Sequence, residues 1–186
     1  MTASTLKRLT IEEFVAQYPE NERLELVHGE VVEKMPPGYS HGIIATRIAS
    51  RLDQWAERNG GHVGNESGFI LFPNGQSLRG PDVFYVRADH IPSGDAPGEM
   101  PHAFVQLAPD LAVEVLSPSE SAQEIQAKVM DFLEAGTPLV WVVYPKLKQV
   151  HAHSADYPVQ IFKLGDTLEN ETVLPGFRCM VSELFR

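Results

Sequence analysis

Two apolar segments of strand length constrain the fold of this chain more than any other feature. Residues 111–116 and 139–144 are apolar on both faces apart from Glu114, which is typical of central strands that are covered on both sides. Between them lies a segment with the apolar spacing of an amphipathic helix, opened by a capping box of Ser121 and Glu124. A strand followed by a helix and a second strand indicates a right-handed parallel crossover. We therefore predict an α/β or α+β fold with a mixed central sheet flanked by helices.

The region before these strands supplies a second helix and two further strands. A helix is expected from a cap at Ser40 to about Asn59, with an apolar stripe at Ile44, Ile48, Leu52 and Trp55. Strands at residues 67–72 and 82–86 complete a core order of helix, three strands, helix and strand. The other expected features are a capping box at Thr10, a hairpin turn at His28 and Gly29, a turn at 73–75, a loop at 90–104 and strands at 149–153 and 172–174.

Length and composition predict a globular protein of the cytoplasm. The chain has 186 residues, which we expect to form a single domain over residues 1–186, and 43% of them are hydrophobic. The chain has one cysteine, Cys179, it has no apolar region of a signal peptide, and it has no apolar run near the roughly 18 residues of a membrane helix. These features together predict a soluble, cytoplasmic protein.

Charge and motifs narrow the classes of function. The net charge of −10 weighs against broad, non-specific binding of nucleic acid, which normally requires a basic surface. It leaves room for a small acidic metal site that touches nucleic acid locally. The P-loop, GxGxxG, HExxH and CxxC patterns are all absent, which excludes the common nucleotide-binding and zinc signatures.

Glu114 interrupts the first apolar strand. A lone ionised carboxylate is costly to bury, so it must pair with a cation, bind a metal ion or take up a proton. One interpretation is a structural ion pair with an arginine or a lysine. The other is a ligand of a hard cation such as Mg²⁺, which prefers carboxylate oxygens.

A metal site requires a second acid, and two Pro-Asp pairs offer one. Asp110 lies four residues before Glu114 on the same strand face, which places it about 13 Å away at ~3.3 Å per residue. Two ligands of one ion lie within roughly 5 Å of each other, so Asp110 is disfavoured. Asp82 begins the preceding strand, and a neighbouring strand at ~4.8 Å would bring it within reach of Glu114. An Asp at a strand start is also ordinary turn chemistry.

Other polar residues are candidates for the same site, each with a plainer structural alternative. Lys128 lies at the edge of the inner face of its helix, where it either reaches water or extends over the sheet toward Glu114. His41 falls on the core-facing side of its helix, as a hydrogen-bonded core histidine or as a site residue at the end of the sheet. Arg79 could bind a phosphate or pair with an acid, and Glu25 on the first hairpin would ordinarily be solvated.

Four sequence blocks together resemble a known family. They are ELVHGEVVEKMPPGYSHG, LRGPDVFYV, PDLAVEVLSPSE and AKVMDFLEAGTPLVWVV, and the closing VLPGF at residues 173–177 fits as well. In order and spacing they resemble the family described as "putative restriction endonuclease", within the PD-(D/E)XK nuclease superfamily, over about residues 10–185. The resemblance implies a restriction-endonuclease-like core of helix, three strands, helix and strand, which agrees with the order expected above.

The resemblance also implies roles for individual residues. Asp82 and Glu114 would ligate Mg²⁺ or Mn²⁺ in an endonuclease that hydrolyses DNA phosphodiester bonds. The lysine of the superfamily normally follows the acid by two residues, and Leu116 stands there in this chain. The family pattern suggests Lys128, on the helix that follows, as its replacement.

Two further residues match the family pattern, and two other functions stay open. His41 matches a histidine at the helix start, and Glu25 matches an ELxxGE block in which His28 stands where Asp is more usual. Both are expected behind the metal site or facing the substrate. The alternatives are a catalytically silent nuclease-fold module, which the displaced lysine and the acidic charge favour, and a metal-dependent hydrolase of a smaller phosphate substrate. Cleavage of both DNA strands by a one-site enzyme would favour a homodimer.

Overall fold

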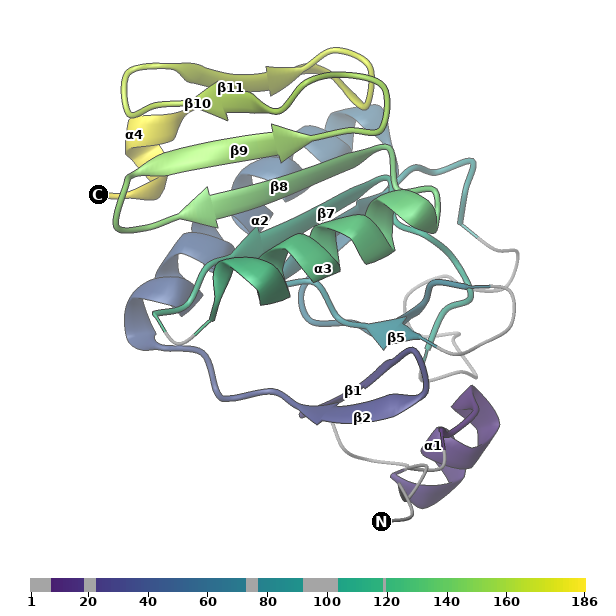
Figure 1. Ribbon diagram of the computed structural model, residues 1–186. Helices are drawn as coiled ribbons and strands as arrows, with labels where there is room; N and C mark the ends of the chain where they lie inside the picture. The colour runs from purple at the N-terminus through teal and green to yellow at the C-terminus, as the bar shows by residue number, and fades with distance from the viewer. Residues whose placement is uncertain (1–7, 19–22, 73–76, 92–103, 119) are drawn as a thin grey trace.

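The computed structural model describes residues 8–18, 23–72, 77–91, 104–118 and 120–186. A six-stranded sheet has helix α2 (Tyr39–Asn59) on one face and helix α3 (Ala122–Glu134) on the other, as Figure 1 shows. The strands lie in the order β10 (Gln160–Phe162), β9 (Gln149–His153), β8 (Leu139–Tyr144), β7 (Leu111–Val115), β6 (Val83–Val86) and β3 (His62–Gly64).

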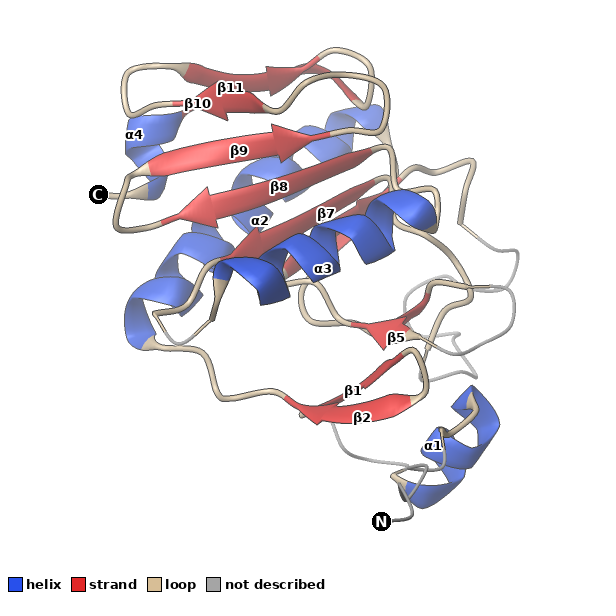
Figure 2. Ribbon diagram, viewed as in Figure 1, coloured by secondary structure: helices blue, strands red, loops and turns tan. Residues whose placement is uncertain are grey.

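The six-stranded sheet is mixed, because β7 and β8 run parallel while its other neighbouring pairs are antiparallel. Helix α3 connects the two parallel strands and covers them (Figure 2). Side chains alternate between the faces, so Val113 and Trp141 pack on the α2 side while Ala112 and Val140 pack on the α3 side. Both faces of β7 and β8 are buried, which explains their doubly apolar sequences.

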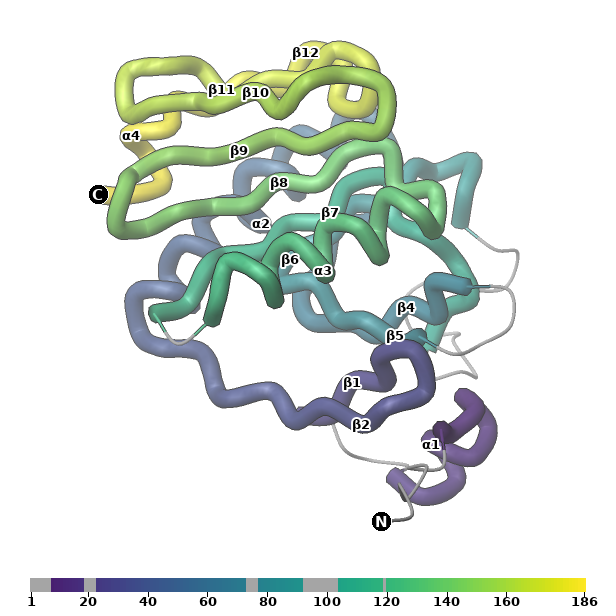
Figure 3. The backbone as a smooth tube through the Cα atoms, viewed as in Figure 1, coloured from purple at the N-terminus to yellow at the C-terminus, as the bar shows by residue number. Residues whose placement is uncertain are grey.

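A smaller sheet from the N-terminal half lies next to the start of β6 (Figure 3). Its strands lie in the order β2 (Glu30–Glu33), β1 (Leu24–Val27), β5 (Leu78–Arg79) and β4 (Phe69–Ile70). Helix α1 (Ile11–Gln17) packs on it through a small core that contains Phe14, Leu26 and Leu78. Three residues, 80–82, join β5 to β6, so the smaller sheet is tied directly to the main one.

The C-terminal segment completes the core on the α2 side. Strands β11 (Thr167–Asn170) and β12 (Leu174–Met180) form a two-stranded sheet, and α4 (Val181–Leu184) follows. Phe177 and Leu184 from this segment join the core cluster that includes Trp55 of α2. Although α2 has 21 residues, neither it nor another helix in the described ranges is apolar enough to cross a bilayer.

The expected core order is confirmed, with one strand exchanged. Between α2 and α3, the main sheet receives β3, β6 and β7. A strand is present within 67–72, but it is only Phe69–Ile70 and it belongs to the smaller sheet, so its expected place in the core order is wrong. Strand β3 was not expected because it contains Gly64 and follows Gly60 and Gly61, and glycine is depleted in strands. Gly64 is required here, since a Cβ on it would lie 2.4 Å from the ring of Phe84 on β6.

Local signals were correct at most turns and wrong at the start of α2. The capping boxes at Thr10 and Ser121 are confirmed, as is the hairpin turn at His28, which has φ of 48°. The expected cap at Ser40 is wrong, because extended Gly38 is the N-cap and the helix starts at Tyr39. The last strand runs over Leu174–Met180, not 172–174. The expected turn at 73–75 and nearly all of the loop at 90–104 lie outside the described residues.

Candidate functional site

Asp82 and Glu114 face each other across two neighbouring strands. β6 and β7 are antiparallel with Val83 opposite Val113, and continuing this register by one residue sets Asp82 opposite Glu114. Residues that stand opposite each other in an antiparallel pair project from the same face of the sheet. The peptide N–H of Val115 donates a hydrogen bond of 2.6 Å to Asp82 Oδ2, which fixes the Asp82 side chain against β7. The two acids therefore lie together at one end of these strands.

Lys128 reaches the same point from α3. Its ammonium Nζ donates to Glu114 Oε2 at 2.9 Å and to Glu120 Oε1 at 2.8 Å. Glu120 lies in the turn between β7 and α3, where its Oε2 accepts the N–H of Ser117 at 2.9 Å. Of the two alternatives for Lys128, the structure shows the one in which the side chain extends over the sheet toward Glu114.

His41 contacts Asp82 from the first turn of α2. Its Nε2 lies 3.0 Å from Asp82 Oδ2, and its Nδ1 is buried with no hydrogen-bond partner among the residues that the structure describes. The backbone of Asp82 is held as well, because Asn65 Nδ2 donates to its carbonyl oxygen at 3.0 Å. Main chain and side chain of Asp82 are thus fixed from three directions.

The geometry leaves one oxygen on each facing acid without a partner. We define the Asp82 cluster by the residues Asp82, Glu114, Glu120, Lys128 and His41. Contacts to Asp82 fall on Oδ2 and contacts to Glu114 fall on Oε2, so within the described residues Oδ1 and Oε1 receive no hydrogen bond or ion pair. Three carboxylates meet one ammonium and one imidazole, which gives the cluster an excess of negative charge.

Ionisation in the Asp82 cluster reflects burial and this charge excess. Burial raises the pKa of Glu114 to about 7, the nearby ammonium of Lys128 opposes the rise, and the charge of Asp82 adds to it. Burial lowers the pKa of Lys128, but the carboxylates of Glu114 and Glu120 outweigh this effect, so the pKa of Lys128 is raised and the ammonium is kept. Burial likewise lowers the pKa of His41, and contact with Asp82 reverses the direction. Glu114 is the member of the cluster whose negative charge is costly.

A second buried group of charges lies behind the first. We define the Arg79 cluster by the residues Arg79, Glu25, Asp131, Lys34 and His28. Arg79 donates from Nε to Asp131 Oδ2 at 2.9 Å and from Nη1 to Glu25 Oε2 at 3.0 Å. His28 Nε2 lies 3.1 Å from Asp131 Oδ1, and Lys34 Nζ lies 3.7 Å from Glu25 Oε1. Each carboxylate oxygen of this cluster has a partner, and the two carboxylates are matched by two cations, Arg79 and Lys34, beside the imidazole of His28.

The Arg79 cluster joins the two parts of the chain that carry the Asp82 cluster. Glu25 Oε1 accepts the N–H of Gly80 at 3.0 Å and Lys34 Nζ donates to the Gly80 carbonyl at 2.9 Å, so the loop before Asp82 is held on both sides. Asp131 follows Lys128 by three residues on α3 and therefore lies one turn further along the same face. Glu25 is ion-paired and buried, not solvated. It contacts the Gly80 loop, and its charge also contributes to the raised pKa of Glu114.

Asp110, the acid of the second Pro-Asp pair, lies at the other end of β7. Its Oδ2 accepts the N–H of Arg87 at 2.8 Å and lies 3.1 Å from His90 Nδ1. Arg87 follows the last residue of β6, whereas Asp82 precedes the first, so the length of the strand separates the two aspartates. The geometry agrees with the expectation that Asp110 does not share a site with Glu114.

Sequence reasoning missed three residues of these clusters. Glu120 sits in a polar turn, where an acid carries no distinguishing signal. Asp131 had a usable signal, because it lies three residues after Lys128 on the buried side of α3 and is itself buried. Lys34 follows an exposed strand, and nothing in its sequence neighbourhood indicates the contact with Gly80.

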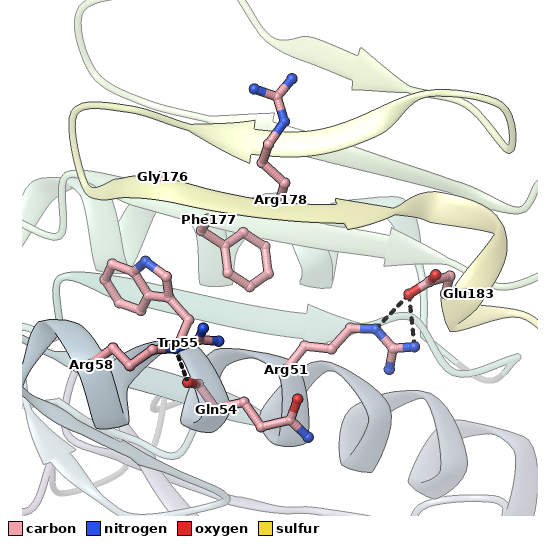
Figure 4. Close-up of a pocket in the computed structure, with 8 residues that line it drawn as sticks. All are labelled: Arg51, Gln54, Trp55, Arg58, Gly176, Phe177, Arg178 and Glu183. Atoms are coloured by element: carbon pink, nitrogen blue, oxygen red, sulfur yellow. Dashed lines mark hydrogen bonds and ion pairs between the residues drawn. The ribbon is translucent and has the colours of Figure 1, made fainter.

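A groove of about 440 Å³ lies elsewhere, between α2 and β12, and none of the candidate residues lines it. Figure 4 shows Arg51 paired with Glu183 at its edge and the Arg178 guanidinium pointing away from α2. Trp55 and Phe177, which also line it, are buried and belong to the core. The groove is therefore a packing seam of the α2 face, and the acids lie outside it.

Comparison with known proteins identifies the fold and the family of the chain. A mixed sheet between two helices, with the strand order described above, defines a restriction-endonuclease-like fold. The chain matches a crystal structure titled as that of "a putative nuclease belonging to DUF820 from Anabaena variabilis ATCC 29413", with a TM-score of 0.82 and 21% identity over 95% of this chain and 97% of that one. Residues 11–182 match the Uma2 family, described as "Putative restriction endonuclease", and the chain belongs to that family. A search of curated proteins gave no match.

Proposed function

We propose that this protein is a divalent-metal-dependent endonuclease that hydrolyses phosphodiester bonds of DNA. The observation that carries the proposal is the pair of facing carboxylates, Asp82 and Glu114, each with one oxygen that lacks a partner among the described residues. Family membership supports a nuclease, and Lys128 supplies the cation that the pattern of the superfamily requires.

The residues present fit Mg²⁺ or Mn²⁺ better than a structural zinc ion. In the described ranges, no three or more His, Cys, Asp or Glu side chains gather closely enough to hold one ion. A structural zinc takes four protein ligands, whereas Mg²⁺ keeps several waters and is usually bound through one or two carboxylates and the phosphates of a substrate. Asp82 and Glu114 would hold the ion. When bound, such an ion polarises a phosphate and lowers the pKa of a bound water.

Lys128 acts as a donor and not as a base. Its raised pKa means that the ammonium keeps its proton over the working pH range. An ammonium has three N–H donors, and Glu114 and Glu120 accept two of them. The third is available to a water or to a phosphate oxygen, where it would orient the nucleophile and offset the negative charge that develops in the transition state.

The remaining contacts keep Asp82 oriented. His41 Nε2 and the Val115 N–H both hold Oδ2, which leaves Oδ1 without a hydrogen bond or ion pair among the described residues. We assign His41 and Glu25 as positioning residues: His41 acts through Asp82, and Glu25 acts through the Gly80 loop.

The test is metal-dependent cleavage by matched variants. Wild type, Asp82→Asn, Glu114→Gln and Asp110→Asn are each incubated with supercoiled plasmid, a single-stranded oligonucleotide and a small phosphodiester, in Mg²⁺, in Mn²⁺ and in EDTA. We expect wild type and Asp110→Asn to cut DNA only with metal, and the other two variants to be inactive while melting normally. DNA binding without cleavage under every condition would instead identify a silent module, and cleavage of the small diester alone would identify a different hydrolase.

A further inference from the structure

The linker segment, residues 34–39, joins β2 to α2 and includes Tyr39, the first residue of α2. It passes beside the Asp82 cluster. At its first residue, Lys34 Nζ donates to the Gly80 carbonyl, two residues before Asp82, at 2.9 Å. Two residues after its last residue, His41 contacts Asp82 at 3.0 Å. Both ends of the linker are therefore anchored to the loop that carries Asp82, and Figure 3 shows the path between the β1–β2 hairpin and the start of α2.

This linker presents two large apolar side chains to solvent. Tyr39 is 88% exposed and Met35 is 75% exposed, the highest values among the large hydrophobic residues that the structure describes. Pro36 and Pro37 lie between them and restrict the backbone, so the linker loses little conformational freedom when a ligand binds. An exposed aromatic ring on a stiff segment next to the Asp82 cluster offers a flat surface on which a planar group of a ligand can stack.

The charges around the site do not suit a duplex. The chain carries a net charge of −10, and the cations nearest the site, Lys34, Arg79 and Lys128, are each paired with a carboxylate. A protein that holds a duplex gains its affinity from several lysine or arginine contacts to phosphates. An unpaired base, by contrast, can also stack on an aromatic side chain whatever its sequence, which adds to the affinity from the contacts with the phosphates. The bases of a duplex are stacked on each other and offer no free face to such a ring.

We infer that the proposed nuclease acts on single-stranded or unpaired DNA, with Tyr39 stacking on the base next to the phosphodiester at the Asp82 cluster. Met35 extends the same apolar surface by one nucleotide. The inference rests on the proposed function and adds the substrate class. The first turn of α2, which carries both Tyr39 and the His41 that contacts Asp82, contains no acidic residue.

The test separates stacking from charge and from cleavage. Binding of a labelled oligothymidylate and of a duplex of equal length is measured by anisotropy in Ca²⁺, for wild type, Tyr39→Phe, Tyr39→Ala and Met35→Ala. Tyr157→Ala is the matched control, because Tyr157 is 74% exposed and follows β9 at the end of the sheet opposite to Glu114. Cleavage of both substrates in Mn²⁺ and thermal melting are recorded in parallel.

We expect wild type to bind the single strand at least about tenfold more tightly than the duplex, and Tyr39→Ala to lose about tenfold of that affinity. Tyr39→Phe keeps the ring and should stay within about twofold of wild type, as should Tyr157→Ala. Equal binding of both substrates, or a Tyr39→Ala variant that binds like the control, would overturn the inference. A concentration-dependent dimer that Tyr39→Ala abolishes would also overturn it, by assigning the surface to a second copy of the chain.

The two proposals fail in different ways. If DNA is cut with metal but duplex is preferred and Tyr39 has no effect, the substrate class is wrong and the nuclease proposal stands. If no DNA is cut although the single strand binds through Tyr39, the surface is confirmed and the proposed hydrolysis is wrong.

Discussion

The two charge clusters of this protein are neighbours, but the carboxylates are fully paired in one and only partly paired in the other. In the Arg79 cluster each carboxylate oxygen has a partner, and Arg79 contacts both acids. In the Asp82 cluster three carboxylates meet one ammonium and one imidazole, and one oxygen of each facing acid lacks a partner among the described residues. Burial raises the pKa of Glu114. Burial alone therefore does not mark a functional site.

The Arg79 cluster supports the Asp82 cluster. A balanced cluster gains a fixed geometry from its hydrogen bonds, since removing one partner leaves an uncompensated buried charge. A cluster with excess negative charge favours the binding of a further cation. The balanced Arg79 cluster holds the Gly80 loop and is joined to α3 at Asp131, and these are the two elements that position Asp82 and Lys128.

Removing either facing acid should give the largest effect on activity. Asp82→Asn and Glu114→Gln remove a ligand while keeping the side-chain shape, and a metal ion contributes several kcal/mol to the transition state, so cleavage should fall by at least about a thousandfold. Melting temperature should change little, because Glu114→Gln also removes a costly buried charge. Cleavage rates and thermal melting measure both, and full activity in either variant would contradict the assignment.

Removing Arg79 should act on the fold instead. Arg79→Met leaves Glu25 and Asp131 buried without their main cation, which should lower the free energy of unfolding by about 3–5 kcal/mol. Urea denaturation measures this loss. Arg79→Lys keeps a charge but cannot contact both acids in the same geometry. Its stability should therefore lie between those of wild type and Arg79→Met. An Arg79→Met variant as stable as wild type would show that the cluster does not hold the fold.

Replacing Lys128 should slow cleavage while sparing the affinity for metal. Lys128→Met removes one transition-state donor, which typically costs about a hundredfold or more in kcat. Without Lys128, Glu114 loses the cation that lowers its pKa. The variant should therefore still bind Mn²⁺ at high pH, where Glu114 is ionised. The measurement is kcat at saturating Mn²⁺, with calorimetry for the metal. A variant with wild-type kcat would place the cation of the reaction elsewhere.

The smallest expected effect is that of pH on metal affinity. With its pKa raised to about 7, Glu114 holds a proton below that pH and the ion must displace it. Affinity for Mn²⁺ should therefore fall by about tenfold per pH unit below 7 and level off above it. His41→Gln is the control, because the pKa of His41 is also raised and this variant removes its titration. Constant affinity between pH 6 and 8 would contradict the raised pKa.

The fold and the pair of acids followed from sequence because local rules determine them. Apolar runs with a helix between them specify β7, α3 and β8, and strand spacing alone separates Asp82 from the decoy Asp110. The position of Lys128 at the edge of an inner helix face allowed its reach toward Glu114 or toward water, and the family resemblance favoured Glu114. Strand β3 was not predicted, because Gly64 within it and Gly61 before it weaken the strand signal. Only the packed structure shows the rings of Phe84 and Tyr85 that lie over these glycines.

The Arg79 cluster could not be predicted in the same way. Its members come from β1, β5, the hairpin turn, the linker and α3, and no local pattern states which arginine will meet which acid. The same holds for Glu120, whose role depends on where the ammonium of Lys128 ends. Contacts between distant segments require the packed structure, whereas contacts set by strand register or helix periodicity do not.

The most direct test of the central claim is a crystal structure of the protein grown with Mn²⁺, with the ion located by its anomalous signal. The account predicts one ion between Asp82 Oδ1 and Glu114 Oε1, with Lys128 still on Glu114 and none at the Arg79 cluster. An empty Asp82 cluster at millimolar Mn²⁺, or an ion held by other residues, would contradict it.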